Sequence, residues 1–125
     1  MSMTNMMEEK IIKHIAGVET FVKPEKYYLG LCTSTNDDGT SVEISAEEYK
    51  RAEVSFKLSS AGCMVNENNV VFEEAKSDWP YINRIGIYDA ETGGNLLFYA
   101  TISLSLVKKG TQIVFKPERI EFYVD

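Results

Sequence analysis

Beyond Pro24, the chain contains no segment in which apolar residues recur at helical spacing, and this feature constrains its fold most strongly. Short runs rich in β-branched and aromatic residues alternate instead with clusters of Gly, Asn, Asp and Ser, a pattern typical of strands joined by turns. These runs are 27–33, 49–58, 70–72, 82–88, 96–106, 112–115 and 119–124. The sequence therefore predicts a mostly β protein with about seven to eight strands.

The intervals between these runs favour antiparallel pairing. Most intervals are short and consist of residues that tolerate turn dihedrals. Parallel strands need crossover connections of about a dozen residues, and only 34–48 and 59–69 approach that length. We therefore expect an antiparallel β-sandwich or flattened barrel over residues 26–125. We expect residues 1–125 to form a single domain, because a chain of this length supplies one core of ordinary size.

The turn at 89–95 is the clearest local signal. Gly93 and Gly94 can adopt the positive φ angles that a tight reversal needs. The runs on either side match in length, so we expect residues 82–88 and 96–103 to pair as an antiparallel hairpin.

The segment before Pro24 differs from the rest of the chain. Apolar residues follow one another at spacings of four, four and three at Met7, Ile11, Ile15 and Val18. This spacing predicts an amphipathic helix over residues 5–18. An isolated helix of this length is marginal in water, so its apolar stripe has to be buried. The stripe can dock on the chain's own sandwich or on another subunit.

Two features favour docking of this helix on another subunit. The connector at 20–26 contains Pro24, which can hold the helix away from the sheet, and Ile12 widens the stripe beyond what one groove covers. The sequence therefore predicts a homo-oligomer in which Met7, Ile11, Ile15 and Val18 form the interface.

Charge and composition exclude several classes of partner. The net charge is −6, and the only basic cluster is Lys108 and Lys109, whereas nucleic-acid binding needs several cations on one face. No stretch approaches the roughly 18 apolar residues of a membrane span. The N-terminus lacks the basic residues and apolar run of a signal peptide. We expect neither nucleic acid nor membrane as a partner.

The potential metal ligands do not form a recognisable site. Cys32, Cys63 and His14 lie in separate segments, and zinc needs about four ligands. The 36–39 and 89–95 loops carry acidic residues, but calcium needs roughly 6–8 oxygens, so structural turns are the preferred interpretation. We expect no metal or cofactor. The cysteines are expected to be reduced and largely buried, with a disulfide as the alternative.

The sequence also offers few candidate catalytic residues. His14 is the only histidine, and its helical position favours a structural role over a Ser/His/Asp or Cys/His arrangement. Carboxylate pairs for glycoside hydrolysis can be drawn from Glu47, Glu48, Glu73 and Glu74, but any acidic protein offers such pairs. The sequence predicts no catalytic residues, and a glycan-cleaving enzyme is the rival interpretation.

Aromatic residues offer a second possibility for binding. Trp79 and Tyr81 lie next to a predicted strand, where aromatic rings can stack on a sugar or fill a protein interface. The alternative for Trp79 is core packing. Arg51 and Arg84 lie within predicted strands, where each is expected to pair with a carboxylate whose identity the sequence does not give.

Several motifs in a fixed order resemble those of a known family. They lie at 27–34, 43–45, 49–51, 78–79, 85–89 and 92–99, and the most specific are Gly-Ile-Tyr-Asp and Gly-Gly-Asn-Leu-Leu. The series resembles small virion proteins of tailed bacteriophages and prophages, usually labelled tail fibre proteins. The chain departs from this pattern at 46–48, where Ala-Glu-Glu replaces a glycine cluster.

The resemblance implies a non-enzymatic structural subunit of a virion, assembled in the cytoplasm of the host bacterium. Its expected partners are copies of itself, for example in a trimer as in many fibre proteins, and other virion proteins, in a tail, head fibre or neck appendage. A host surface glycan is a further expected partner, and a carbohydrate-binding module using Trp79 and tyrosines is the alternative function. A shared fold alone does not assign a function.

Overall fold

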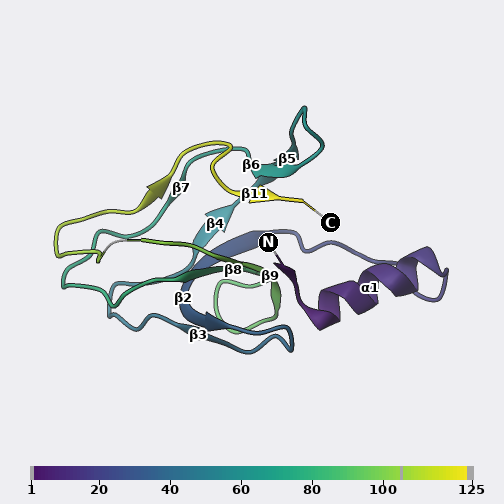
Figure 1. The fold of residues 1–125 in the computed structure, drawn as a ribbon, viewed down its shortest axis with the longest axis horizontal. Coiled ribbons are helices and arrows are strands. Elements are labelled where there is room, and N and C mark those ends of the chain that lie inside the picture. Colours follow the sequence, from purple (N-terminus) through teal and green to yellow (C-terminus); the bar gives the residue numbers. More distant parts are fainter. Residues whose placement is uncertain (1, 105, 124–125) are drawn as a thin grey trace.

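The computed structural model describes residues 2–104 and 106–123. It contains one helix, α1 (Asn5–Ile15), among short strands (Figure 1). The strands are β1 (Ser2–Met3), β2 (Tyr27–Thr35), β3 (Ser41–Glu43), β4 (Ala52–Val54), β5 (Phe56–Leu58), β6 (Met64–Asn66), β7 (Val70–Val71), β8 (Arg84–Tyr88), β9 (Leu96–Thr101), β10 (Val114–Phe115) and β11 (Glu121–Phe122).

The strands form three antiparallel sheets. The main sheet has the order β1-β9-β8-β2-β3, and β4 also pairs with β2. The other two sheets are the pair β10-β7 and the triplet β11-β6-β5. The mostly β class, the antiparallel pairing and the single N-terminal helix predicted from the sequence are confirmed.

The hairpin expected around Gly93 and Gly94 is also confirmed. β8 and β9 pair antiparallel from Arg84 opposite Thr101 to Tyr88 opposite Leu96, with an irregularity between Ile87 and Tyr88. Both glycines have positive φ angles, 64° and 69°. The turn therefore uses the backbone freedom for which the glycines are required.

The hydrophobic core lies between the main sheet and the two smaller sheets. Leu29 and Ile87 are paired across β2 and β8, and both point into this core. Phe72 and Phe122, from the segments that form the opposite layer, belong to the same cluster. These apolar residues are separated by long stretches of sequence, so the core is assembled from distant segments.

The strands are shorter and more numerous than the sequence patterns indicate. The predicted run 49–58 is divided into β4, which pairs with β2, and β5, which pairs with β6. Ser55 lies between them, and its carbonyl accepts a hydrogen bond from the Glu67 N–H at 2.8 Å. The chain thus passes from one layer to the other within one apolar run, which periodicity does not reveal.

The helix ends at Ile15, and the predicted boundary at Val18 is wrong. Gly17 adopts φ +73°, and the N–H of Val18 donates to the carbonyl of Lys13 at 2.9 Å. A glycine in the left-handed region followed by such a bond is a common helix terminus. The predicted stripe is therefore interrupted before its last member. Among the described residues, no helix is long and apolar enough to span a membrane.

Candidate functional site

We call residues 5–26, which comprise α1 and the connector that leads to β2, the N-terminal arm. The arm is fixed to the sheet at its start. Thr4 is fully buried, its N–H donates to the Leu97 carbonyl at 3.0 Å, and its Oγ1 donates to the Leu96 carbonyl at 2.8 Å. Met7 is only 5% exposed. These contacts attach the first turn of α1 to the beginning of β9.

The far end of the arm projects from the molecule. In Figure 1, α1 points away from the sheets, and the connector returns beside it. The N–H of Phe21 donates to His14 Nδ1 at 3.0 Å, so the histidine links the connector to the helix. The role of His14 in this structure is therefore to shape the arm.

The four predicted interface residues have different environments. Met7 is buried within its own chain, and Ile11 is half-buried. Ile15 and Val18 are 79% and 75% exposed, and two further aliphatic residues, Ile12 and Val22, are 65% and 82% exposed. Sequence periodicity missed Val22 because this residue lies beyond the predicted helix. Four exposed aliphatic side chains thus lie on the last turn of α1 and on the connector that follows it, where Val22 also lines the cleft between the arm and the 89–95 turn.

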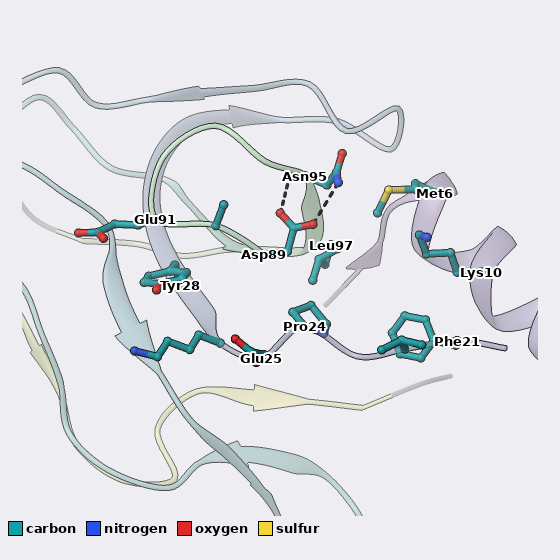
Figure 2. A pocket seen from close by; sticks show the side chains of 13 residues that line it. Met6, Lys10, Phe21, Pro24, Glu25, Tyr28, Asp89, Glu91, Asn95 and Leu97 are labelled. Atoms are coloured by element: carbon teal, nitrogen blue, oxygen red, sulfur yellow. Dashed lines mark hydrogen bonds between the residues drawn. The ribbon is translucent and has the colours of Figure 1, made fainter.

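A cleft of about 500 Å³ lies between the arm and the 89–95 turn (Figure 2). Tyr28 and Leu97 line it from the sheet, and Lys10 and Phe21 line it from the arm. This volume is in the range of roughly 300–1,000 Å³ that is usual for small-molecule sites. Both apolar and polar residues line the cleft.

The 89–95 turn that borders the cleft is held by its own side chains. Asp89 accepts hydrogen bonds from the Asn95 backbone N–H at 2.7 Å and from Asn95 Nδ2 at 3.0 Å. Asp89 and Asn95 therefore serve the turn, in agreement with the structural interpretation of this loop. Among the described residues, no group of three or more potential ligands is arranged for a metal ion.

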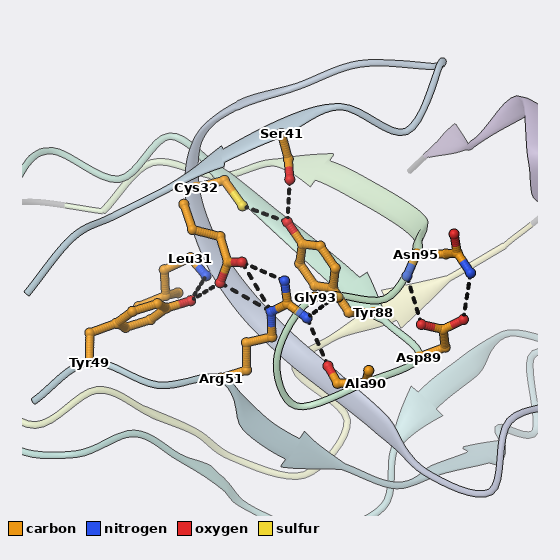
Figure 3. Close-up of polar contacts among 11 residues, drawn as sticks. Leu31, Cys32, Ser41, Tyr49, Arg51, Tyr88, Asp89, Ala90, Gly93 and Asn95 are labelled. Carbon is orange, nitrogen blue, oxygen red and sulfur yellow. Dashed lines mark hydrogen bonds and ion pairs between the residues drawn. The ribbon is translucent and has the colours of Figure 1, made fainter.

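The buried guanidinium of Arg51 is hydrogen-bonded to the backbone of the same turn (Figure 3). Arg51 Nη1 donates to the carbonyls of Ala90 and Gly93 at 2.8 and 2.7 Å. Arg51 Nε and Nη2 donate to both carboxylate oxygens of Glu43 at 2.5–3.2 Å. The expected carboxylate partner of Arg51 is thus Glu43. Through this ion pair, β3 and β4 fix the position of the turn between β8 and β9.

Tyr88 completes this cluster. The Arg51 guanidinium lies 3.5 Å from the centre of the Tyr88 ring, a cation–π contact. A Cβ atom on Gly30 or Gly86 would come within 3.1 Å of this ring, so the glycines provide the space that it occupies. The Tyr88 hydroxyl shares hydrogen bonds with Ser41 Oγ at 2.6 Å and Cys32 Sγ at 3.4 Å.

Burial changes the titration of these groups. It raises the pKa of Cys32 to about 11, and it also raises the pKa values of Tyr88 and Tyr49. The cause is the loss of hydration that the charged forms would suffer. Cys32 is fully buried and Cys63 half-buried, so the prediction of burial holds fully only for Cys32. The two cysteines are not joined to each other, and their reduced state stays a prediction.

The pKa of Cys32 predicts a loss of stability at alkaline pH. Because it is higher in the folded than in the unfolded chain, the unfolded state releases its proton first as the pH rises. Stability is full below about pH 9 and decreases by on the order of 2 kcal/mol by about pH 11. Urea unfolding across this range should show a smaller decrease for Cys32→Ala than for the wild type. Equal slopes would contradict the prediction.

Trp79 is 1% exposed and lies in the core, so the alternative of core packing is correct for this residue. Its Nε1–H donates to Glu48 Oε1 at 2.7 Å, and the same oxygen accepts the Lys76 N–H at 2.8 Å. A ring buried in this way is not available to stack on a sugar. Tyr81, the other predicted glycan contact, is 50% exposed.

The fold defines the chain as an antiparallel β-sandwich protein with a helical arm at its N-terminus. Its sequence matches the model of one family, Podophage GP4 fiber I protein gp80, over residues 2–122, and the chain belongs to that family. The resemblance to phage tail-fibre-type structural proteins is thereby confirmed. A comparison with curated proteins found none that matches the chain.

Proposed function

We propose that this protein is a fibre or appendage subunit that assembles with copies of itself, and with other virion proteins, through the exposed end of its N-terminal arm. Membership of a phage fibre family supports a structural component of the virion. The observation that carries the proposal is the exposure of four aliphatic residues of the arm, Ile12, Ile15, Val18 and Val22. Assembly is proposed to take place in the host cytoplasm.

The physical reason for assembly is the hydrophobic effect. Burying each of these side chains stabilises an interface by roughly 1.5–3 kcal/mol before the loss of association entropy is subtracted. In the isolated chain these side chains face solvent. A homo-oligomer such as a trimer removes them from water, as is usual for exposed apolar surface at an interaction site.

The replacement Ile15→Glu should convert the oligomer into a monomer. A carboxylate at this position has to be desolvated in the interface, and the cost of an unpaired buried charge is several kcal/mol. Light scattering after gel filtration measures the change in mass. The fold should be unaffected, because Ile15 is 79% exposed in the single chain.

Leu58→Glu is the matched control, since Leu58 is also aliphatic and 75% exposed but lies in β5, outside the arm. It should leave the oligomer intact. A monomeric wild type, or an oligomer that survives Ile15→Glu, would refute assembly through the arm. Deletion of residues 1–18 is a poorer test, because it also removes the buried Thr4 and Met7.

A second candidate function is the binding of a host surface glycan, and the cleft beside Tyr28 favours it. Sugars present apolar faces and hydroxyl groups, and this cleft offers the Tyr28 and Phe21 rings together with Lys10 and Glu91. The hydrogen bonds from Arg51 to the carbonyls of Ala90 and Gly93 keep one wall of the cleft in place without a ligand. Preorganisation of this kind lowers the cost of binding.

A glycan array with two matched variants tests this function. Tyr28→Ala should reduce binding by about five- to thirtyfold, since a stacking contact contributes on the order of 1–2 kcal/mol. Tyr81→Ala removes a half-exposed tyrosine outside the residues lining the cleft and should have no effect. Loss of binding only with Tyr81→Ala would move the site to Tyr81, and absence of binding to every glycan would refute the function.

A further inference from the structure

We propose that the projecting end of the arm docks into a groove on a neighbouring copy of the chain, between β9 and the segment that contains β11. This inference rests on the proposed self-assembly and identifies the surface that receives the arm. Two copies then contact each other through different surfaces, the arm of one copy and the groove of the other.

The groove has the size and chemistry to accept aliphatic side chains. Its volume is about 330 Å³. The buried Ile85 and Ile120 contribute to its lining, together with the half-buried Ala100, Ile102 and Phe115. The apolar part of this lining can contact the end of the arm, where the exposed residues Ile15 and Val18 lie. Burial of both surfaces together removes more apolar area from water than burial of either alone.

The arm of the same chain is directed away from this groove. The arm is bonded to β9 at Leu96 and Leu97, whereas the groove lies around Ala100 and Ile102. Along an extended strand, the distance from Leu97 to Ile102 is roughly 17 Å. From its attachment, α1 points away from the sheets (Figure 1). Another copy has to supply the arm that fills the groove.

The charges around the two surfaces are complementary. Arg119 and Glu121 are exposed residues of the groove lining. The arm carries Glu19 next to Val18 and Lys23 next to Val22, and both charged residues are exposed. In the proposed contact, Glu19 of one copy pairs with Arg119 of the other, and Lys23 pairs with Glu121. Opposite charges at the rim of an interface fix its orientation.

Contact between two arms alone buries less surface than docking of an arm into the groove. α1 has 11 residues and is about 16 Å long. Its exposed aliphatic side chains cover less than the approximately 800 Å² per partner of a standard stable interface. Docking of an arm into a groove adds the groove surface to the contact. Because donor and acceptor surfaces differ, such contacts close into a ring, for example a trimer or a two-fold dimer with exchanged arms, or continue as a filament.

A mixing experiment with two variants tests the inference. Ile15→Glu disables the arm and leaves the groove intact. Thr101→Glu disables the groove and leaves the arm intact, at an exposed position that should preserve the fold. Each variant alone should be a monomer. An equimolar mixture should form a one-to-one dimer, because one functional arm and one functional groove remain, and light scattering reports the mass.

The outcomes separate this inference from the proposed function. If Ile15→Glu is a monomer but the mixture forms no dimer, or if Thr101→Glu remains an oligomer, the groove does not receive the arm, and assembly through the arm still stands. If the wild type is a monomer, both are wrong. Thermal unfolding of each variant checks its fold, and the Leu58→Glu chain should assemble as the wild type does. Should Thr101→Glu unfold, Arg119→Glu at the exposed rim replaces it and should weaken assembly, with restoration by Glu19→Arg in the same chain.

Discussion

Replacing Arg51 by methionine should lower the free energy of unfolding by about 3 kcal/mol, near the lower end of the range for breaking a buried ion pair from one side. The Arg51 side chain is 7% exposed and that of Glu43 is 24% exposed. Methionine fills similar space but leaves the Glu43 carboxylate without its cation. The carbonyls of Ala90 and Gly93 also lose their donor, so the 89–95 turn should become more mobile.

Urea unfolding measures this effect, and the adjacent Lys50 provides the control. Lys50 is 60% exposed and pairs with Glu73 at 3.5 Å, so Lys50→Met should change stability by less than about 0.5 kcal/mol. Adding Glu43→Leu to Arg51→Met should recover part of the loss, because no unpaired charge then remains. Equal stability of the Arg51→Met and Lys50→Met chains would show that the ion pair does not hold this part of the fold.

The replacement Asn66→Asp should be at least as damaging, with a loss of about 4 kcal/mol of stability, as expected for an unpaired charge in a buried site. Asn66 is fully buried. Its Nδ2 donates to the carbonyls of Asn68 and Lys116, both at 2.9 Å, and its Oδ1 accepts the Ile120 N–H at 2.8 Å. An aspartate keeps the acceptor but directs a second oxygen at two carbonyls. The side-chain hydrogen bonds from position 66 to the carbonyls of Asn68 and Lys116 are thereby lost.

Asn68→Asp is the matched control, since the same substitution is made at an exposed residue two positions away. It should change the urea midpoint little. The loss in Asn66→Asp should be smaller at acidic pH than at neutral pH, because a protonated carboxyl is uncharged and can donate one hydrogen bond. A defect that does not depend on pH would argue against charge burial as its cause.

The helix and the 89–95 hairpin were predictable because their signals are local. A helix is indicated by spacings of three and four residues, and a tight turn by adjacent glycines. Both signals involve residues that are close in sequence. The same reasoning predicted that Arg51 pairs with a carboxylate, because a cation within a strand needs a partner. It did not identify Glu43, because the choice depends on how β3 and β4 flank β2.

The candidate interface and glycan-contact residues were harder to predict from the sequence. Met7 and Ile15 occupy equivalent positions in the helical pattern, yet one is 5% and the other 79% exposed. The difference arises because only the first turn of α1 is attached to β9, through Thr4. The burial of Trp79 could not be predicted, because the local sequence does not distinguish a tryptophan of a surface site from one in the core.

The sequence by itself determined the mostly β class, the antiparallel pairing, the N-terminal helix and the membership of a phage fibre family, because periodicity, turn residues and motif order are properties of the chain. Only the tertiary structure decided which apolar residues remain in solvent and which carboxylate pairs with Arg51. It also brought Tyr28, Phe21 and Glu91 to one cleft. These contacts join segments far apart in the chain, and their geometry follows from the packing of the sheets against one another.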